Sequence, residues 1–140
     1  MNQGTILVVE DDPALREVIC ETLQLANYRV ETVENGQEAL RLVDINPNIT
    51  LLLSDVQMQP MDGYALLKAV KSTHPQIPVV LMTAYGTIEK AVQAMHEGAN
   101  DYLVKPFEAE TLMDMVARFI VPTSRGEDGF IAIDPRSQQL

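Results

Sequence analysis

The sequence has one cysteine, Cys20, in 140 residues. A single thiol excludes a disulfide framework and a metal site built from cysteine thiolates. No apolar run reaches the roughly 20 residues that a membrane span needs, and the N-terminus lacks the basic and then apolar segment of a secretory signal. We therefore expect a cytoplasmic protein that does not associate with membranes.

Positive charge is also scarce. Ten basic side chains stand against 20 acidic ones, which leaves a formal net charge of −10. An excess of negative charge disfavours contact with the phosphates of nucleic acids or of anionic lipids. We expect no direct nucleic acid binding by this chain, and the charge suits a basic partner or a bound cation.

Short apolar runs alternate with amphipathic helix patterns along most of the chain. The expected strands cover residues 5–9, 28–33, 51–55, 77–82 and 101–104. A helix pattern follows each of them, so each crossover spans the sheet and the strands must run parallel. The pattern predicts an α/β fold of the flavodoxin-like (CheY-like) class, with a doubly wound sheet in strand order 2-1-3-4-5 and helices on both faces.

The helix expected at residues 87–97 carries apolar side chains at helical spacing. Ile88, Ala91, Val92 and Met95 recur at helical spacing, so we expect them to face the core. Gly98 follows as the expected left-handed residue that ends the helix.

Acidic side chains end two of these strands. Glu10 and Asp11 follow the first strand, and Asp55 ends the third. Neighbouring strands lie about 4.8 Å apart, so these carboxylates should meet at one edge of the sheet. Like charges in one crevice repel unless a cation joins them. Carboxylate oxygens select a hard cation, so we expect Mg²⁺ here, or Mn²⁺ in its place.

Two further strand ends add groups that handle phosphate. Thr83 follows the fourth strand and Lys105 follows the fifth. A carboxylate nucleophile such as Asp55 can accept a phosphoryl group, and a metal with an ammonium group would neutralise the transferring oxygens. The combination predicts phosphoryl transfer to Asp55.

These residues and their spacing resemble the receiver domain of a two-component response regulator over residues 5–121. The resemblance implies that Asp55 is the phosphoacceptor. It also implies that Asp11 and Asp55 bind Mg²⁺ together with the backbone carbonyl of Gln57, while Glu10 acts through water. Such a domain receives its phosphoryl group from a sensor histidine kinase and is a signalling switch rather than a turnover enzyme.

The resemblance assigns further roles. Thr83 and Lys105 would hold the phosphoryl oxygens, Thr83 and Tyr102 would form the switch pair, and the bond before Pro106 would be cis. One departure is that Gln59 stands where the family usually has proline, four residues after the phosphoacceptor. This departure bears on the rigidity of the loop and leaves the chemistry unchanged.

The segments 82–85 (MTAY) and 102–107 (YLVKPF) resemble NtrC-type activators of sigma-54 transcription, most of all the flagellar regulators related to FleR and FlrC. The implied organisation is a receiver domain at 1–122, a linker at 123–129 and, at 130–140, the start of an AAA+ ATPase domain. The resemblance also indicates the surface for partners, including a second copy: the last two helices and the fifth strand.

Three other classes of protein would differ from this sequence at specific positions. An aspartyl phosphatase would need an acid two residues after Asp55, where Gln57 stands. A flavin-binding module would need a glycine- and hydroxyl-rich phosphate loop after the first strand, where three acids stand. A degenerate receiver that only binds partners would not need the acids, Thr83 and Lys105, which are all present.

Overall fold

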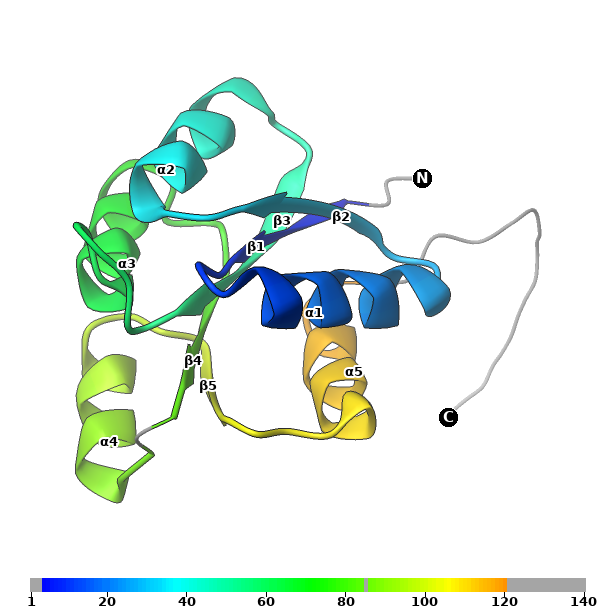
Figure 1. The fold of residues 1–140 in the computed structure, drawn as a ribbon. Helices are drawn as coiled ribbons and strands as arrows, with labels where there is room; N and C mark the ends of the chain where they lie inside the picture. Colours follow the sequence, from blue (N-terminus) through cyan, green and yellow to red (C-terminus); the bar gives the residue numbers. More distant parts are fainter. Residues whose placement is uncertain (1–3, 85, 121–140) are drawn as a thin grey trace, which may run out of the picture.

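The computed structural model describes residues 4–84 and 86–120, in which strands and helices alternate (Figure 1). The strands are β1 (Thr5–Val9), β2 (Arg29–Val33), β3 (Ile49–Asp55), β4 (Val79–Thr83) and β5 (Asp101–Val104). The helices are α1 (Pro13–Leu25), α2 (Gly36–Ile45), α3 (Gly63–Thr73), α4 (Ile88–His96) and α5 (Ala109–Ala117). In these two ranges no helix is both long and apolar enough to cross a membrane.

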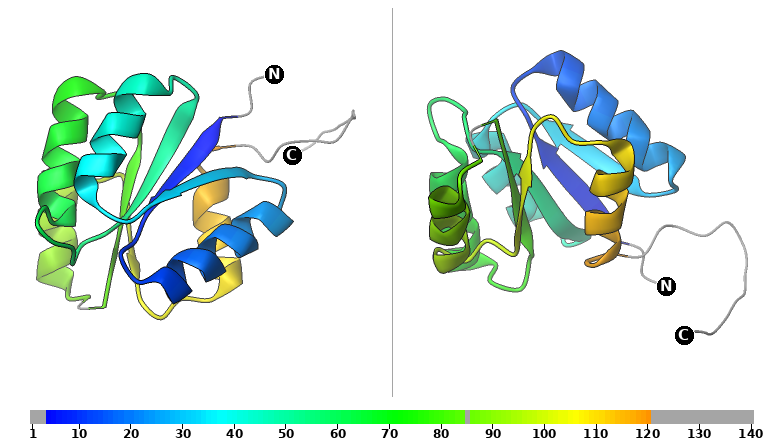
Figure 2. Two further views of the ribbon diagram at one scale, coloured as in Figure 1. Left: turned by 45° about the horizontal axis from the view of Figure 1, so that its top comes forward. Right: turned by 90° about the horizontal axis from the view of Figure 1, so that it is seen from below.

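The strands form one parallel sheet in the order β2-β1-β3-β4-β5. Helices α2, α3 and α4 cover one face, and α1 and α5 cover the other (Figure 2). The predicted fold class and strand order are therefore confirmed. The order reverses between β1 and β3, so the crevice that such sheets use for ligands lies at their carboxyl ends.

Alternate residues of the central strands feed two separate cores. Leu52 and Leu81 belong to the cluster under α2 and α3, whereas Leu53 and Met82 belong to the cluster under α1 and α5. Side chains of a strand alternate between the faces of its sheet, so a central strand covered on both sides must be apolar throughout. This explains why the sequences of β1, β3 and β4 are nearly continuous apolar runs.

Side-chain caps begin four of the helices, directly after strands or loops at the carboxyl edge of the sheet. A side-chain oxygen of the capping residue accepts a hydrogen bond from a backbone N–H in the first turn, which satisfies a group that the helix leaves open. The capping residues are Asp12, Asn35, Asp62 and Thr87. Asp12 therefore caps α1 and is not part of the acidic cluster formed by Glu10 and Asp11.

The prediction for the buried face of α4 was wrong. Ile88 is 84% exposed, Val92 50% and Met95 48%, and the buried residue of this helix is Ala94. Helix α4 lies at the β5 edge of the sheet (Figure 1), where only a narrow strip of the helix can reach the core. Helical spacing reveals an apolar stripe but not whether another element covers it. The prediction for Gly98 is confirmed, since its φ is +107°.

The predicted linker at 123–129 and the further domain expected at 130–140 lie outside the described residues. They therefore remain predictions from the sequence.

Candidate phosphoryl-transfer site

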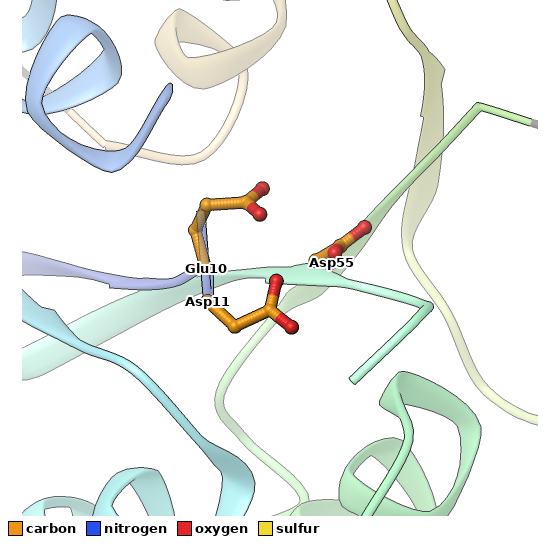
Figure 3. Close-up of side chains that lie close together, drawn as sticks. All are labelled: Glu10, Asp11 and Asp55. Carbon is orange, nitrogen blue, oxygen red and sulfur yellow. The ribbon is translucent and has the colours of Figure 1, made fainter. Parts of the chain in front are cut away.

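Three carboxyl groups lie together at the carboxyl edge of the sheet. The pairing of Val9 with Ser54 places Glu10 beside Asp55 on the neighbouring strand. One carboxylate oxygen from each of Glu10, Asp11 and Asp55 lies within 4.8 Å of the other two. In Figure 3 the carboxylates of the two consecutive acids extend toward the side on which Asp55 lies.

The three acids differ in burial. Glu10 is 1% exposed and Asp55 is 5% exposed, whereas Asp11 is open to solvent. The cluster is therefore a shallow site with two acids at its base and one at its rim. An ion could enter past Asp11 while still contacting a buried carboxylate.

Lys105 joins the cluster from the other side of β4. Its Nζ lies 3.0 Å from Oε1 of Glu10 and 3.0 Å from Oδ1 of Asp55. The backbone N–H of Lys105 donates to the carbonyl of Thr83 at 2.7 Å. This hydrogen bond fixes the position of the Lys105 backbone, from which the side chain extends to the acids. The peptide bond between Lys105 and Pro106 is cis, as is the one between Gln59 and Pro60.

The electrostatics of the cluster follow from burial. Burial raises the pKa of Glu10, and the charge of Asp55 adds to this, although hydrogen bonds from Lys105 and from the Asp12 backbone N–H oppose it. Burial alone would lower the pKa of Lys105, but its hydrogen bonds to Glu10 and Asp55 outweigh burial and the net pKa is raised. Lys105 is therefore a cation at neutral pH.

The donor set fits a hard divalent cation. The ammonium group of Lys105 pairs with two of the three carboxyl groups of the cluster. A shallow set of oxygen donors with an open side suits Mg²⁺, which keeps several of its waters. The set offers neither imidazole nor thiolate among the described residues, so softer metals have no ligand that they would prefer.

The loop after β3 is held tightly over Asp55. The N–H of Gly63 donates to the carbonyl of Val56 at 2.8 Å. A Cβ on Gly63 would lie 2.5 Å from the carbonyl oxygen of Asp55, so a side chain cannot be accommodated without a shift. Met58 is 4% exposed and anchors the loop, while Gln57 before it is exposed. The sequence analysis gave Gly63 no role, because a close approach leaves no signal beyond the glycine itself.

Thr83 and Tyr102 lie on one face of the sheet. Leu81 pairs with Tyr102, and Thr83 follows Leu81 by two residues, so both side chains point toward the side covered by α3 and α4. Thr83 is 2% exposed. Tyr102 is half-buried and packs against the core cluster on that side.

Tyr64, at the start of α3, is a residue that the sequence analysis missed. It packs against the same cluster as Tyr102, and the hydroxyl oxygens of both residues are buried. Burial raises the pKa of Tyr64 to about 12, and the nearby Tyr102 contributes. Aromatic side chains at helical spacing look like ordinary core residues, so no sequence signal distinguishes this one.

Arg16 was missed as well. Its Nη1 donates to the backbone carbonyl of Glu10 at 2.9 Å. A basic residue one turn into the helix after an acidic loop is common on protein surfaces, so its position alone does not reveal this contact.

The chain is similar to known response regulators over most of its length. A family model described as "Response regulator receiver domain" matches residues 6–117. The response regulator FleR of Pseudomonas aeruginosa is 46% identical over 137 residues, which cover 96% of this chain and 29% of that protein. The transcriptional regulator NtrC of Escherichia coli is 43% identical over 121 residues, which cover 86% of this chain and 25% of NtrC. The chain thus spans less than a third of the length of these relatives.

Solved structures agree with this family match. The chemotaxis protein CheY4 of Vibrio cholerae superposes with a TM-score of 0.76 at 34% identity, over 84% of this chain and 99% of that one. The receiver domain of NtrX from Brucella abortus gives a TM-score of 0.76 at 34% identity, over 81% and 95% of the two chains.

Proposed function

Because this chain belongs to the response regulator receiver domain family, we propose that Asp55 accepts a phosphoryl group from a sensor histidine kinase in a Mg²⁺-dependent step. The observation that carries the proposal is the position of Lys105, whose Nζ lies 3.0 Å from both Glu10 and Asp55. An ammonium group held between two buried acids is placed to neutralise the charge that a phosphoryl group brings.

The step needs only the phosphohistidine donor and one proton from the solvent. A carboxylate oxygen of Asp55 attacks the phosphorus of a phosphohistidine, so an O–P bond forms as the N–P bond breaks. The electron pair of the broken bond stays on the imidazole nitrogen, which takes up a proton. Lys105 keeps its own proton throughout, since its raised pKa holds it as a cation that faces the transferring oxygens.

The same acids would hold the metal. Asp11, Asp55 and the backbone carbonyl of Gln57 would bind Mg²⁺ directly, and Glu10 would act through a water molecule. A bound Mg²⁺ ion supplies charge neutralisation at the phosphoryl oxygens. Mn²⁺ has similar preferences and could replace it.

The signal would pass through Thr83 and Tyr102, which face the same side of the sheet. The hydroxyl of Thr83 would donate to a phosphoryl oxygen, and the ring of Tyr102 would turn further inward. A new charge-assisted hydrogen bond of this kind biases a two-state element. The domain is thus a switch that assists its own phosphorylation and dephosphorylation.

The role in a longer protein rests on the relatives. FleR and NtrC are regulators of which this chain matches 29% and 25%. By analogy the chain would be the receiver domain of a cytoplasmic sigma-54 activator. It would control an AAA+ domain that follows the linker at residues 123–129. The similarity to FleR points to flagellar genes as the targets. The exposed apolar residues of α4, with β5 and α5, are the candidate surface for a second copy.

Intact mass measurement after incubation with acetyl phosphate tests the central step. Wild type and the control Asp114→Ala, which changes an exposed acid on α5, should gain one phosphoryl group with Mg²⁺ and none with excess chelator. Asp55→Ala should gain none under either condition. An unmodified wild type would favour a degenerate receiver that only binds partners.

A further inference from the structure

The turn from Glu10 to Asp12 must bring the carboxyl groups of Glu10 and Asp11 into the metal-binding cluster, while Asp12 caps α1. Strand β1 ends at Val9 and α1 begins at Pro13. The N–H of Glu10 donates to the carbonyl of Val33 at 3.2 Å, and the N–H of Asp12 donates to Oε2 of Glu10 at 3.2 Å. These bonds fix the two ends of the turn and leave the peptide unit between Glu10 and Asp11 to be held from elsewhere.

Arg16 holds that peptide unit. Its guanidinium reaches back along α1, and Nη1 donates to the carbonyl of Glu10 at 2.9 Å. The carbonyl of Glu10 and the N–H of Asp11 share one planar peptide unit, so fixing the first also fixes the second. The orientation of this plane sets the direction in which the Asp11 side chain leaves the backbone.

Asp11 depends on the backbone more than the other two acids do. Glu10 and Asp55 are buried and hydrogen-bonded to Lys105. Asp11 is exposed, and within residues 4–84 and 86–120 its carboxylate makes no hydrogen bond or ion pair, because the hydrogen bonds of this turn involve its neighbours. Its carboxylate is therefore held in the metal-binding cluster by the turn alone.

Arg16 and Lys105 act at different places. Lys105 touches the carboxylates themselves, whereas the hydrogen bond of Arg16 goes to a backbone carbonyl. Arg16 also lines a surface cavity of about 380 Å³, together with Glu34 and Asn35 before α2 and Glu38 in its first turn. A role through backbone orientation thus fits its position better than a role as a counter-ion.

We propose that Arg16 is a positioning residue for the metal site: its hydrogen bond to the Glu10 carbonyl orients the Glu10–Asp11 peptide so that Asp11 presents its carboxylate to the ion. This inference rests on the proposed Mg²⁺ binding. Groups that orient metal ligands through one hydrogen bond typically affect metal affinity by about 10- to 100-fold. The value for Arg16 should lie near the lower end, because Asp55 and Glu10 keep their places without it.

Titration calorimetry with Mg²⁺ tests the inference on the whole chain. Arg16→Met keeps the aliphatic stem but removes the donors, and it should bind Mg²⁺ about tenfold more weakly than wild type. Arg16→Lys keeps a cationic donor group at the end of a shorter side chain, and its affinity should fall between those of wild type and Arg16→Met. Arg41→Met is the matched control, since Arg41 is an exposed arginine on α2 that pairs with Glu38; its affinity should equal that of wild type.

A second readout separates positioning from a general loss of structure. With acetyl phosphate, the Mg²⁺ concentration that gives half the maximal phosphorylation rate should rise about tenfold in Arg16→Met, while the rate at saturating Mg²⁺ returns to the wild-type value. Arg16→Gln has a side chain too short to reach the Glu10 carbonyl, so it should behave like Arg16→Met. It replaces the methionine variant if that one does not fold.

The outcomes are distinguishable. If wild type binds Mg²⁺ and Arg16→Met or Arg16→Gln binds it as tightly as Arg41→Met does, the role of Arg16 is refuted and the proposed function stands. If wild type shows no Mg²⁺ binding, the proposed function fails and the inference fails with it.

Discussion

Nζ of Lys105 lies 3.0 Å from Oε1 of Glu10, although 95 residues separate the two in the sequence. The contact arises because β1 and β5 both end at the same edge of the sheet. In this state the ammonium group is occupied by the acids, so it must exchange one of these contacts for a phosphoryl oxygen when Asp55 is modified. Mg²⁺ binding to the acids and the transmission of the signal to Tyr102 should therefore depend on Lys105 to different degrees.

Replacing Lys105 should separate them. Lys105→Ala is expected to bind Mg²⁺ at least as tightly as wild type, because a competing cation leaves the acids. It should not carry the change to Tyr102, which nuclear magnetic resonance of the ring protons would follow after phosphorylation or with a phosphoryl analogue. Lys68→Ala, an exposed lysine on α3, is the control. Reorientation of Tyr102 in the Lys105 variant would contradict this role.

The buried carboxylate of Glu10 should cost stability when no metal is bound. Burial raises the pKa of Glu10 above its ordinary value of 4.5, so the folded chain holds this proton more tightly than the unfolded chain. Stability from this group is thus present at low pH and is lost as the pH rises from about 4.5 through the folded value. Glu10→Gln should then unfold at higher temperature than wild type at pH 7.

The difference between Glu10→Gln and wild type should shrink as the pH falls below 4.5, where both side chains are neutral. Lys105 does not change the pH dependence in the range where Glu10 titrates, because the contribution of Lys105 to stability is lost only as the pH rises beyond 10.5. Glu21→Gln, at an exposed position of α1, serves as the control. The measurement is thermal unfolding at several pH values in the presence of chelator. If Glu10→Gln is less stable than wild type at pH 7, the stabilisation from the Lys105 ion pair exceeds the cost of burying the Glu10 carboxylate.

Gly63 should matter to the site as well as to the fold. A Cβ at this position would lie 2.5 Å from the carbonyl oxygen of Asp55, so Gly63→Ala must push the loop away from the strand. We expect a loss of about 1–3 kcal/mol in the free energy of unfolding and weaker Mg²⁺ binding. Asp62→Ala removes only the cap of α3, costs about 1 kcal/mol, and should leave the Mg²⁺ affinity unchanged. Equal Mg²⁺ affinities in the two variants would argue against the close approach.

Tyr64 should ionise at unusually high pH. Burial, with Tyr102 nearby, raises its pKa to about 12. Absorbance titration of the phenolate in wild type and in Tyr64→Phe should differ by one group that titrates near that value. A difference centred at the ordinary value of 10 would mean that the hydroxyl of Tyr64 is accessible to water.

Local patterns predicted the sheet because each of its central strands is buried on both faces. Such strands are short apolar runs. An acid marks where each run stops, since Glu10 directly follows β1 and Asp55 is the last residue of β3. Parallel strands bring those ends to one edge, so the meeting of Glu10, Asp55 and Lys105 follows from topology alone. This is why the members of the candidate cluster were visible before the structure.

Other features depend on what packs where, which a local pattern does not contain. The stripe of Ile88 and Val92 on α4 has the spacing of a buried face, yet the helix sits at the sheet edge and leaves it exposed. The contact of Arg16 with a carbonyl depends on the path of a long side chain. The fit of Gly63 against Asp55 depends on the exact approach of a loop.

The most direct test of the central claim is to locate the phosphoryl group. Borohydride reduces an aspartyl phosphate at its acyl carbon, releasing phosphate and leaving homoserine, which peptide mass spectrometry assigns to one residue. After treatment with acetyl phosphate and Mg²⁺, homoserine is predicted at position 55 and at no other acid. Homoserine at Asp11 or Asp12, or a phosphoryl adduct that leaves position 55 unreduced, would contradict the assignment of Asp55 as the phosphoacceptor.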